Sequence, residues 1–151
     1  MRQTKSAWFL FLSLVVFVLD RFLKTQLFRS EQLEISIISQ LLNFTLHKNY
    51  GIGANLALPQ SLTIILSLII ITALTWWLVK SNNKKTKLAL VLILTGAISN
   101  LIDRVVYGFV VDYISFVNLS FINLADLLIF LGLLSLIFQK RERPADESGR
   151  Q

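Results

Sequence analysis

The stretch SLTIILSLIIITALTWWLV, residues 61–79, carries no charged residue. A bilayer hydrocarbon core of about 30 Å is crossed by roughly 20 mostly apolar helical residues. Pro59 and Ser61 provide a helix start, and Trp76 and Trp77 lie where aromatic side chains gather at a membrane interface. The stretch therefore predicts a transmembrane helix.

Three further segments meet the same criterion: residues 6–27, 88–107 and 121–138. The chain of 151 residues is 54% hydrophobic, well above a typical soluble domain. Residues 6–27 follow a basic start, MRQTK, as in a signal peptide, but Asp20, Arg21 and Lys24 stand where a small-residue cleavage site would be needed. We predict a mainly α membrane protein with four transmembrane helices in one domain, residues 1–139, and a polar cytoplasmic tail, 140–151.

The basic residues predict the orientation, because short loops rich in Lys and Arg stay in the cytoplasm. Such residues precede the first predicted helix, occupy KSNNKKTK (80–87) and follow the fourth helix. These three regions lie on one side of a four-helix topology, so we expect both termini to be cytoplasmic. The net charge of +6 then requires no nucleic-acid partner, since the cations flank apolar runs and are not interleaved with aromatics on a binding face.

The outer side receives the connections 28–60 and 108–120. In the first, LNFTLHKN (42–49) alternates as a half-buried strand does, with Leu42, Phe44 and Leu46 on one face and Asn43, Thr45 and His47 on the other. GANLAL (53–58) is a candidate partner strand. We predict a small β element over about residues 33–58 on the outer membrane surface, with His47 solvated.

Four aspartates lie near the outer ends of the apolar segments. Asp20, Asp103 and Asp126 fall within the predicted helices, and Asp112 follows the third. At a rise of 1.5 Å per residue, the first three reach a similar depth. Ionisable groups inside membrane helices are energetically expensive and mark functional candidates. We therefore expect the four carboxylates to converge in the outer third of the membrane.

Some of these groups also have structural interpretations. Asp20 and Lys24, spaced i, i+4, suit an interfacial ion pair with the lysine extended toward the surface. Asn100, Asp103 and Arg104 suit a polar cluster that holds the third helix in the bundle. A further cluster, Asn123 and Asp126, has no basic neighbour in sequence to neutralise its carboxylate.

The composition restricts the chemistry. Cysteine is absent and His47 is the single histidine, which excludes a cysteine nucleophile and the usual Cys/His zinc sites. Two adjacent carboxylates can share one proton, so that one acts as a base on water and the other as an acid. This is the chemistry of aspartic proteases and needs no metal or cofactor. Spacing alone leaves open which two of the four aspartates form the pair.

Five motifs occur in a particular order: DRFLK (20–24), NYGIGA (49–54), GAISNLIDR (96–104), VVDYI (110–114) and INLAD (122–126). On this hydropathy profile they resemble the bacterial lipoprotein signal peptidases, also called signal peptidase II. The resemblance covers nearly the whole chain. It implies catalytic roles for Asp112 and Asp126. It also implies substrate-binding or supporting roles for Asn49, Asn100, Arg104 and Asn123, and a polar framework of Asp20, Lys24 and Asp103.

The resemblance also implies a substrate and a location. The substrates would be prolipoproteins whose lipobox cysteine carries diacylglycerol, cleaved on the N-terminal side of that cysteine. The enzyme would be a monomer without cofactor in the bacterial inner membrane, in contact with membrane lipids, with its active site on the periplasmic side. Five positions differ from the family pattern and are expected to alter the pocket and its substrate preference: Gly53, Ala54, Ser99, Ile122 and Leu127.

Two other functions remain as alternatives. Intramembrane carboxylates also mark ion paths, which is consistent with a small proton or cation transporter. Against it, the charged groups gather at one depth and no matching set lines the inner half. The second alternative is a non-catalytic factor that binds lipid-modified partners.

Overall fold

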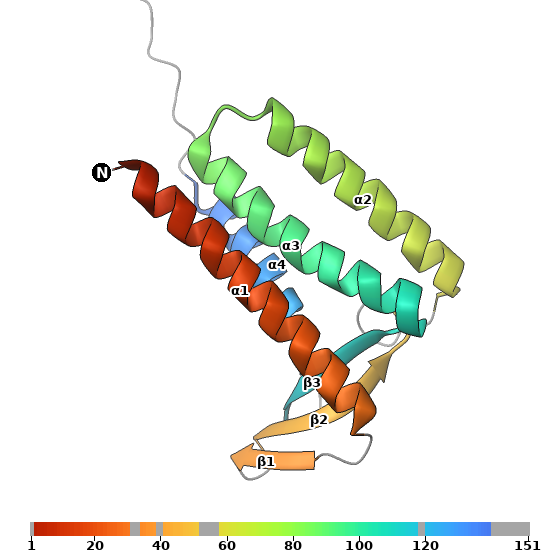
Figure 1. Ribbon diagram of the computed structural model, residues 1–151. Coiled ribbons are helices and arrows are strands. Elements are labelled where there is room, and N and C mark those ends of the chain that lie inside the picture. Colours follow the sequence, from red (N-terminus) through yellow and green to blue (C-terminus); the bar gives the residue numbers. More distant parts are fainter. Residues whose placement is uncertain (1, 31–33, 39–40, 52–57, 118–119, 140–151) are drawn as a thin grey trace, which may run out of the picture.

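A computed structural model of the protein describes residues 2–30, 34–38, 41–51, 58–117 and 120–139. These residues form a helical bundle with a sheet at one end (Figure 1). The helices are α1 (Arg2–Arg29), α2 (Gln60–Lys80), α3 (Lys84–Tyr107) and α4 (Leu124–Ile137). The strands are β1 (Glu34–Ile38), β2 (Leu42–Asn49), β3 (Val110–Phe116) and β4 (Ser120–Ile122).

Helices are present at all four predicted positions, which confirms them. Some helix ends differ from the prediction, and capping residues explain part of the difference. α3 begins at Lys84, ahead of the predicted residue 88, because the Asn83 side chain accepts hydrogen bonds from the backbone N–H groups of Lys85 and Thr86. It ends at Tyr107, the predicted residue, and is capped by Gly108, which adopts a left-handed φ of 84°. α1 extends at both ends beyond the predicted 6–27, to Arg2–Arg29.

The predicted start of the fourth helix, residue 121, is wrong. Residues 120–122 form β4 instead, and α4 begins after Asn123. Asn123 and Asp126 form a capping box, in which each side chain accepts a hydrogen bond from the other's backbone N–H. This cap fixes the first turn of α4 and the position of Asp126 on it.

The central helix of the bundle is α3, which packs against α4, α2 and α1 (Figure 1). Two glycines permit the close approach of α3 and α4. A Cβ at Gly96 would lie 2.2 Å from the carbonyl oxygen of Ala125, and one at Gly132 would lie 2.8 Å from that of Ala89. The backbones therefore meet where no side chain fits between them.

The four strands form one antiparallel sheet in the order β1-β2-β3-β4. The predicted strand at 42–49 is confirmed as β2, but the predicted β element was incomplete, because β2 pairs with β3 from the second connection. The candidate strand at 53–58 lies, except for Leu58, outside the described residues. The predicted alternation is also wrong: Asn43 is buried, and a register shift separates Phe44 from His47.

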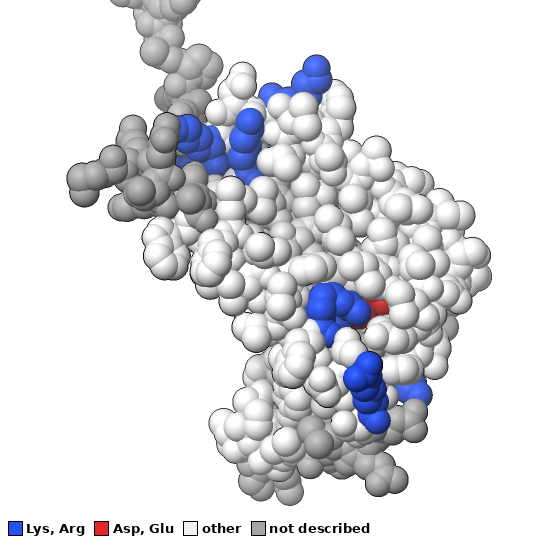
Figure 2. All heavy atoms as spheres, viewed as in Figure 1, with Lys and Arg blue, Asp and Glu red and all other residues white. Residues whose placement is uncertain are grey.

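The outside of the bundle is apolar. By length and composition, α2 and α3 could each cross a membrane, and α4 is a shorter apolar helix. Large apolar side chains are exposed along the helices, including Trp8, Phe11, Phe22, Ile69 and Phe130. On the face in Figure 2, Lys and Arg gather toward two ends, with a broad uncharged surface between them. This distribution is typical of a protein whose middle contacts lipid.

Candidate active site

A cavity of about 700 Å³ lies where the sheet meets α2, α3 and α4. Its helical walls are mainly apolar and include Leu66, Ile70 and Leu74 of α2. Its polar lining includes Asp112 of β3 and Asp126 of α4. The structure thus brings two of the four predicted aspartates to one cavity.

The Asp112 carboxylate is fully buried and receives one amide donor on each oxygen. Asn123 Nδ2 donates to Oδ1 at 2.6 Å, and Asn49 Nδ2 donates to Oδ2 at 2.9 Å. Burial raises the pKa of Asp112 to about 6, and the nearby charge of Asp126 adds to the increase, whereas the two amide donors oppose it. Asp112 can therefore hold a proton at a pH where an ordinary aspartate would not.

Asp126 lies on the first turn of α4 and lines the same cavity as Asp112. Asn100 Nδ2 donates to its Oδ1 at 2.8 Å, and the backbone N–H of Asn123 donates to its Oδ2 at 3.3 Å. Asn123 consequently contacts both carboxylates, one through its side chain and one through its backbone. A single residue sets the relative position of the two acids.

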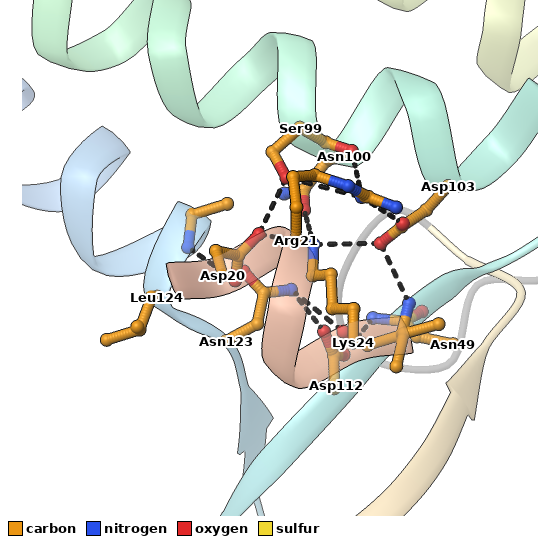
Figure 3. A network of polar contacts seen from close by, with 12 residues as sticks. Asp20, Arg21, Lys24, Asn49, Ser99, Asn100, Asp103, Asp112, Asn123 and Leu124 are labelled. Carbon is orange, nitrogen blue, oxygen red and sulfur yellow. Dashed lines mark hydrogen bonds and ion pairs between the residues drawn. The ribbon is translucent and has the colours of Figure 1, made fainter. Parts of the chain in front are cut away.

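Lys24 is the centre of a buried polar network behind this pair (Figure 3). Its ammonium lies 2.8 Å from Asp103 Oδ2, 3.1 Å from Asp20 Oδ2 and 2.9 Å from Asn100 Oδ1. Its side chain has 0% exposure, so the interpretation of a lysine extended toward the surface is wrong. Through Asn100, whose amide also reaches Asp126, the network supports the cavity.

Three network members were not found from the sequence. Arg21 forms an ion pair with Asp103. Ser99 Oγ donates to Asp20 at 2.6 Å, and the Tyr113 hydroxyl donates to Asp20 at 2.9 Å. Burial raises the pKa of Tyr113, so its hydroxyl remains a donor. In the sequence, only the departure from the family pattern at Ser99 pointed to one of these three residues. The serine provides a hydroxyl donor to the buried Asp20 carboxylate.

The predicted site residues Asn49 and Arg104 line the cavity. Of the positions that differ from the family pattern, Ile122 also lines it. Leu127 is exposed, and positions 53 and 54 lie outside the described residues.

The prediction that His47 is solvated is wrong. Its side chain is half-buried, lines the cavity and stacks on Phe121, with ring centroids 4.0 Å apart and planes at 12°. Burial lowers the pKa of His47, so its imidazole is uncharged at neutral pH. Its position two residues before Asn49, on the same strand face, could have indicated that it faces the cavity.

The arrangement combines two carboxyl groups, amide donors that fix them and an apolar recess beside them. Because one carboxyl has a raised pKa and the other lies nearby, the pair is suited to hold one proton between them. Such a pair can polarise a water molecule with one member and donate a proton with the other.

A family model and similar curated proteins indicate one family. A family model described as "Signal peptidase (SPase) II" matches residues 12–140. A lipoprotein signal peptidase of Caldicellulosiruptor bescii is 36% identical, over 87% of this chain and 87% of its own length. That of Actinobacillus succinogenes is 33% identical over 97% and 99%. A solved bacterial membrane enzyme superposes with a TM-score of 0.77 at 25% identity, covering 93% of this chain and 94% of its own.

Proposed function

The chain belongs to the signal peptidase II family of proteases, which remove signal peptides from lipoproteins, and from that premise we propose that Asp112 and Asp126 are its catalytic dyad. The observation that carries this proposal is the double contact of Asn123. Its side chain donates to Asp112 and its backbone donates to Asp126. Both acids border one cavity, and burial raises the pKa of Asp112.

In the proposed reaction, the ionised carboxylate takes a proton from a water molecule as its oxygen attacks the scissile carbonyl carbon. The protonated carboxyl hydrogen-bonds the carbonyl oxygen and stabilises the developing charge. Collapse of the tetrahedral intermediate breaks the C–N bond, and the departing amine receives a proton from the dyad. One carboxyl must be charged and the other neutral, so the pH–rate profile is bell-shaped.

The remaining polar residues support this reaction. Asn49, Asn100 and Asn123 orient the carboxylates through the hydrogen bonds described above. Arg104 lines the cavity close to both acids and is suited to bind carbonyl oxygens of the substrate. The buried Asp20, Lys24 and Asp103 act as framework: none of them lines the cavity, Lys24 donates to Asn100, and the two carboxylates hold the Lys24 ammonium.

We propose the membrane arrangement that the basic residues predict. All four helices cross or enter the membrane, both termini lie in the cytoplasm, and the sheet lies on the periplasmic side of the inner membrane. The 14 residues of α4 extend only about 21 Å, so α4 begins below the outer surface and Asp126 lies within the membrane boundary. The scissile bond of a prolipoprotein anchored by diacylglycerol on its cysteine lies at that depth.

The test uses the purified protein in proteoliposomes with a prolipoprotein that carries, or lacks, diacylglycerol on the lipobox cysteine. Cleavage only of the lipid-modified form, with a product that begins at the modified cysteine by mass spectrometry, is the expected result. Proton uptake into the vesicles without peptide cleavage would favour the transporter instead. Stable binding of the prolipoprotein without turnover would favour the non-catalytic factor.

A further inference from the structure

The stacked rings of His47 and Phe121 form one wall of the cavity, here named the aromatic wall. His47 belongs to β2 and Phe121 to β4, and their centroids are 4.0 Å apart with the planes at 12°. Both residues line the cavity that also contains Asp112 and Asp126. The proposed catalytic residues do not include this pair, so its place in the cavity requires another explanation.

The aromatic wall lies directly beside the dyad. His47 and Asp112 are register partners across β2 and β3, so their side chains share a face of the sheet. Directly opposed Cβ atoms in such a pair are about 4.5–5.5 Å apart. In the sheet, the strands that carry His47 and Phe121 flank β3, the strand that carries Asp112. The wall and Asp112 therefore border the same part of the cavity.

The two ends of the cavity differ in chemistry. On the helical side, Leu66, Ile70 and Leu74 of α2 form an apolar surface that suits the apolar part of a signal peptide. The sheet, whose strand β3 carries Asp112, stands at the end of the bundle (Figure 1). A peptide whose apolar segment lies along the helices crosses the dyad and leaves over the sheet. The residues after the scissile bond then pass the aromatic wall.

We infer that His47 and Phe121 form the subsite for the residues that immediately follow the lipid-modified cysteine. This inference rests on the proposed function and assigns the mature side of the substrate to the sheet. The wall is flat, and the lowered pKa of His47 keeps its imidazole uncharged beside Asp112. It is suited to pack against the peptide plane and small uncharged side chains.

The experiment compares two diacylglyceryl lipopeptides in micelles, one ending at the cysteine as an amide and one continuing for five small uncharged residues. For the long substrate, His47→Ala and Phe121→Ala lower kcat/KM about tenfold, which corresponds to 1.4 kcal/mol. For the short substrate they change it by less than about twofold. His47→Phe preserves a flat ring and retains the wild-type value for the long substrate.

Phe28→Ala is the matched control, because the Phe28 ring contacts that of Tyr107 in a tilted arrangement, with centroids 4.5 Å apart, and does not line the cavity. It leaves the ratio of the two substrates unchanged. Thermal unfolding checks that each variant is folded. If Phe121→Ala does not fold, Phe121→Leu replaces it, because leucine keeps a bulky side chain but has no flat ring. Equal losses for both substrates, or no loss for the long one, would overturn the subsite. Failure of the wild type to cleave either substrate would instead contradict the proposed function.

Discussion

At the residue scale, the negative and positive charges of the framework next to the dyad are equal in number. Asp20 and Asp103 face Lys24 and Arg21, so this framework holds two acids and two bases. An ammonium has three donors, and all three of Lys24 reach an acceptor. A buried lysine of this kind holds α1 and α3 together only while every partner is present.

We expect Lys24→Met to lower the free energy of unfolding by about 3–5 kcal/mol, because it leaves two buried carboxylates with fewer partners. Arg21→Met should have a smaller effect, since the Arg21 side chain is 19% exposed and water can replace part of its contact. Unfolding in mild detergent, followed by circular dichroism, measures both. Lys80→Met, at the end of α2, is the control. Similar losses for Lys24→Met and Lys80→Met would contradict the framework role.

The raised pKa of Asp112 predicts a pH dependence of stability. The folded state binds this proton more tightly than the unfolded chain, so the contribution of Asp112 is most favourable below pH 3.8 and is lost as pH rises through about 6. Relative to Asp112→Asn, the wild type should gain at most about 3 kcal/mol in free energy of unfolding between pH 7 and pH 4. Unfolding of both proteins across this range measures it. A pH-independent difference would show that the pKa is not raised.

The sequence motifs predicted most of the charged residues that meet in the site. They could not predict their partners, because the contact of Asn49 with Asp112 depends on the pairing of β2 with β3, which are far apart in the chain. The same applies to His47, whose neighbour Phe121 lies on another strand. Alternation in one strand does not reveal what covers its polar face.

At the scale of the elements, apolar length predicted all four helices, but β3 was not predicted. Its burial pattern begins with four consecutive buried residues, Val110 to Tyr113, because both faces of the strand are covered. A strand covered on both faces lacks the alternation by which an isolated sequence indicates β structure. β4 is only three residues long and was included in the apolar run of the fourth helix.

The α3–α4 contact predicts a sensitive position. Gly96→Ala should lower the free energy of unfolding by about 1–3 kcal/mol, because its Cβ would meet the Ala125 carbonyl and force α4 away. Since Ala125 precedes Asp126, we also expect cleavage to fall more than stability alone explains. Cleavage assays on folded protein, with Gly132→Ala as the control farther along α4, measure this. Equal activity in the two variants would contradict a link between Gly96 and the dyad.

At the scale of the whole molecule, the proposed topology places the sheet and the α2–α3 connection on opposite sides of the membrane. The chain has no cysteine, so single cysteines report their side without background. Ser36→Cys in β1 should react with a membrane-impermeant maleimide in intact spheroplasts. Asn82→Cys, between α2 and α3, should react only after permeabilisation. The reverse pattern would contradict the orientation predicted from the basic residues.

The central claim is that Asp112 and Asp126 together activate water, and their separate replacement by asparagine tests it most directly. Asparagine has nearly the same shape but cannot accept or donate the proton. The rate of cleavage of a diacylglyceryl prolipoprotein should fall to background in Asp112→Asn and in Asp126→Asn, while both proteins insert, fold and bind the substrate. Cleavage at an appreciable fraction of the wild-type rate in either folded variant would contradict the account.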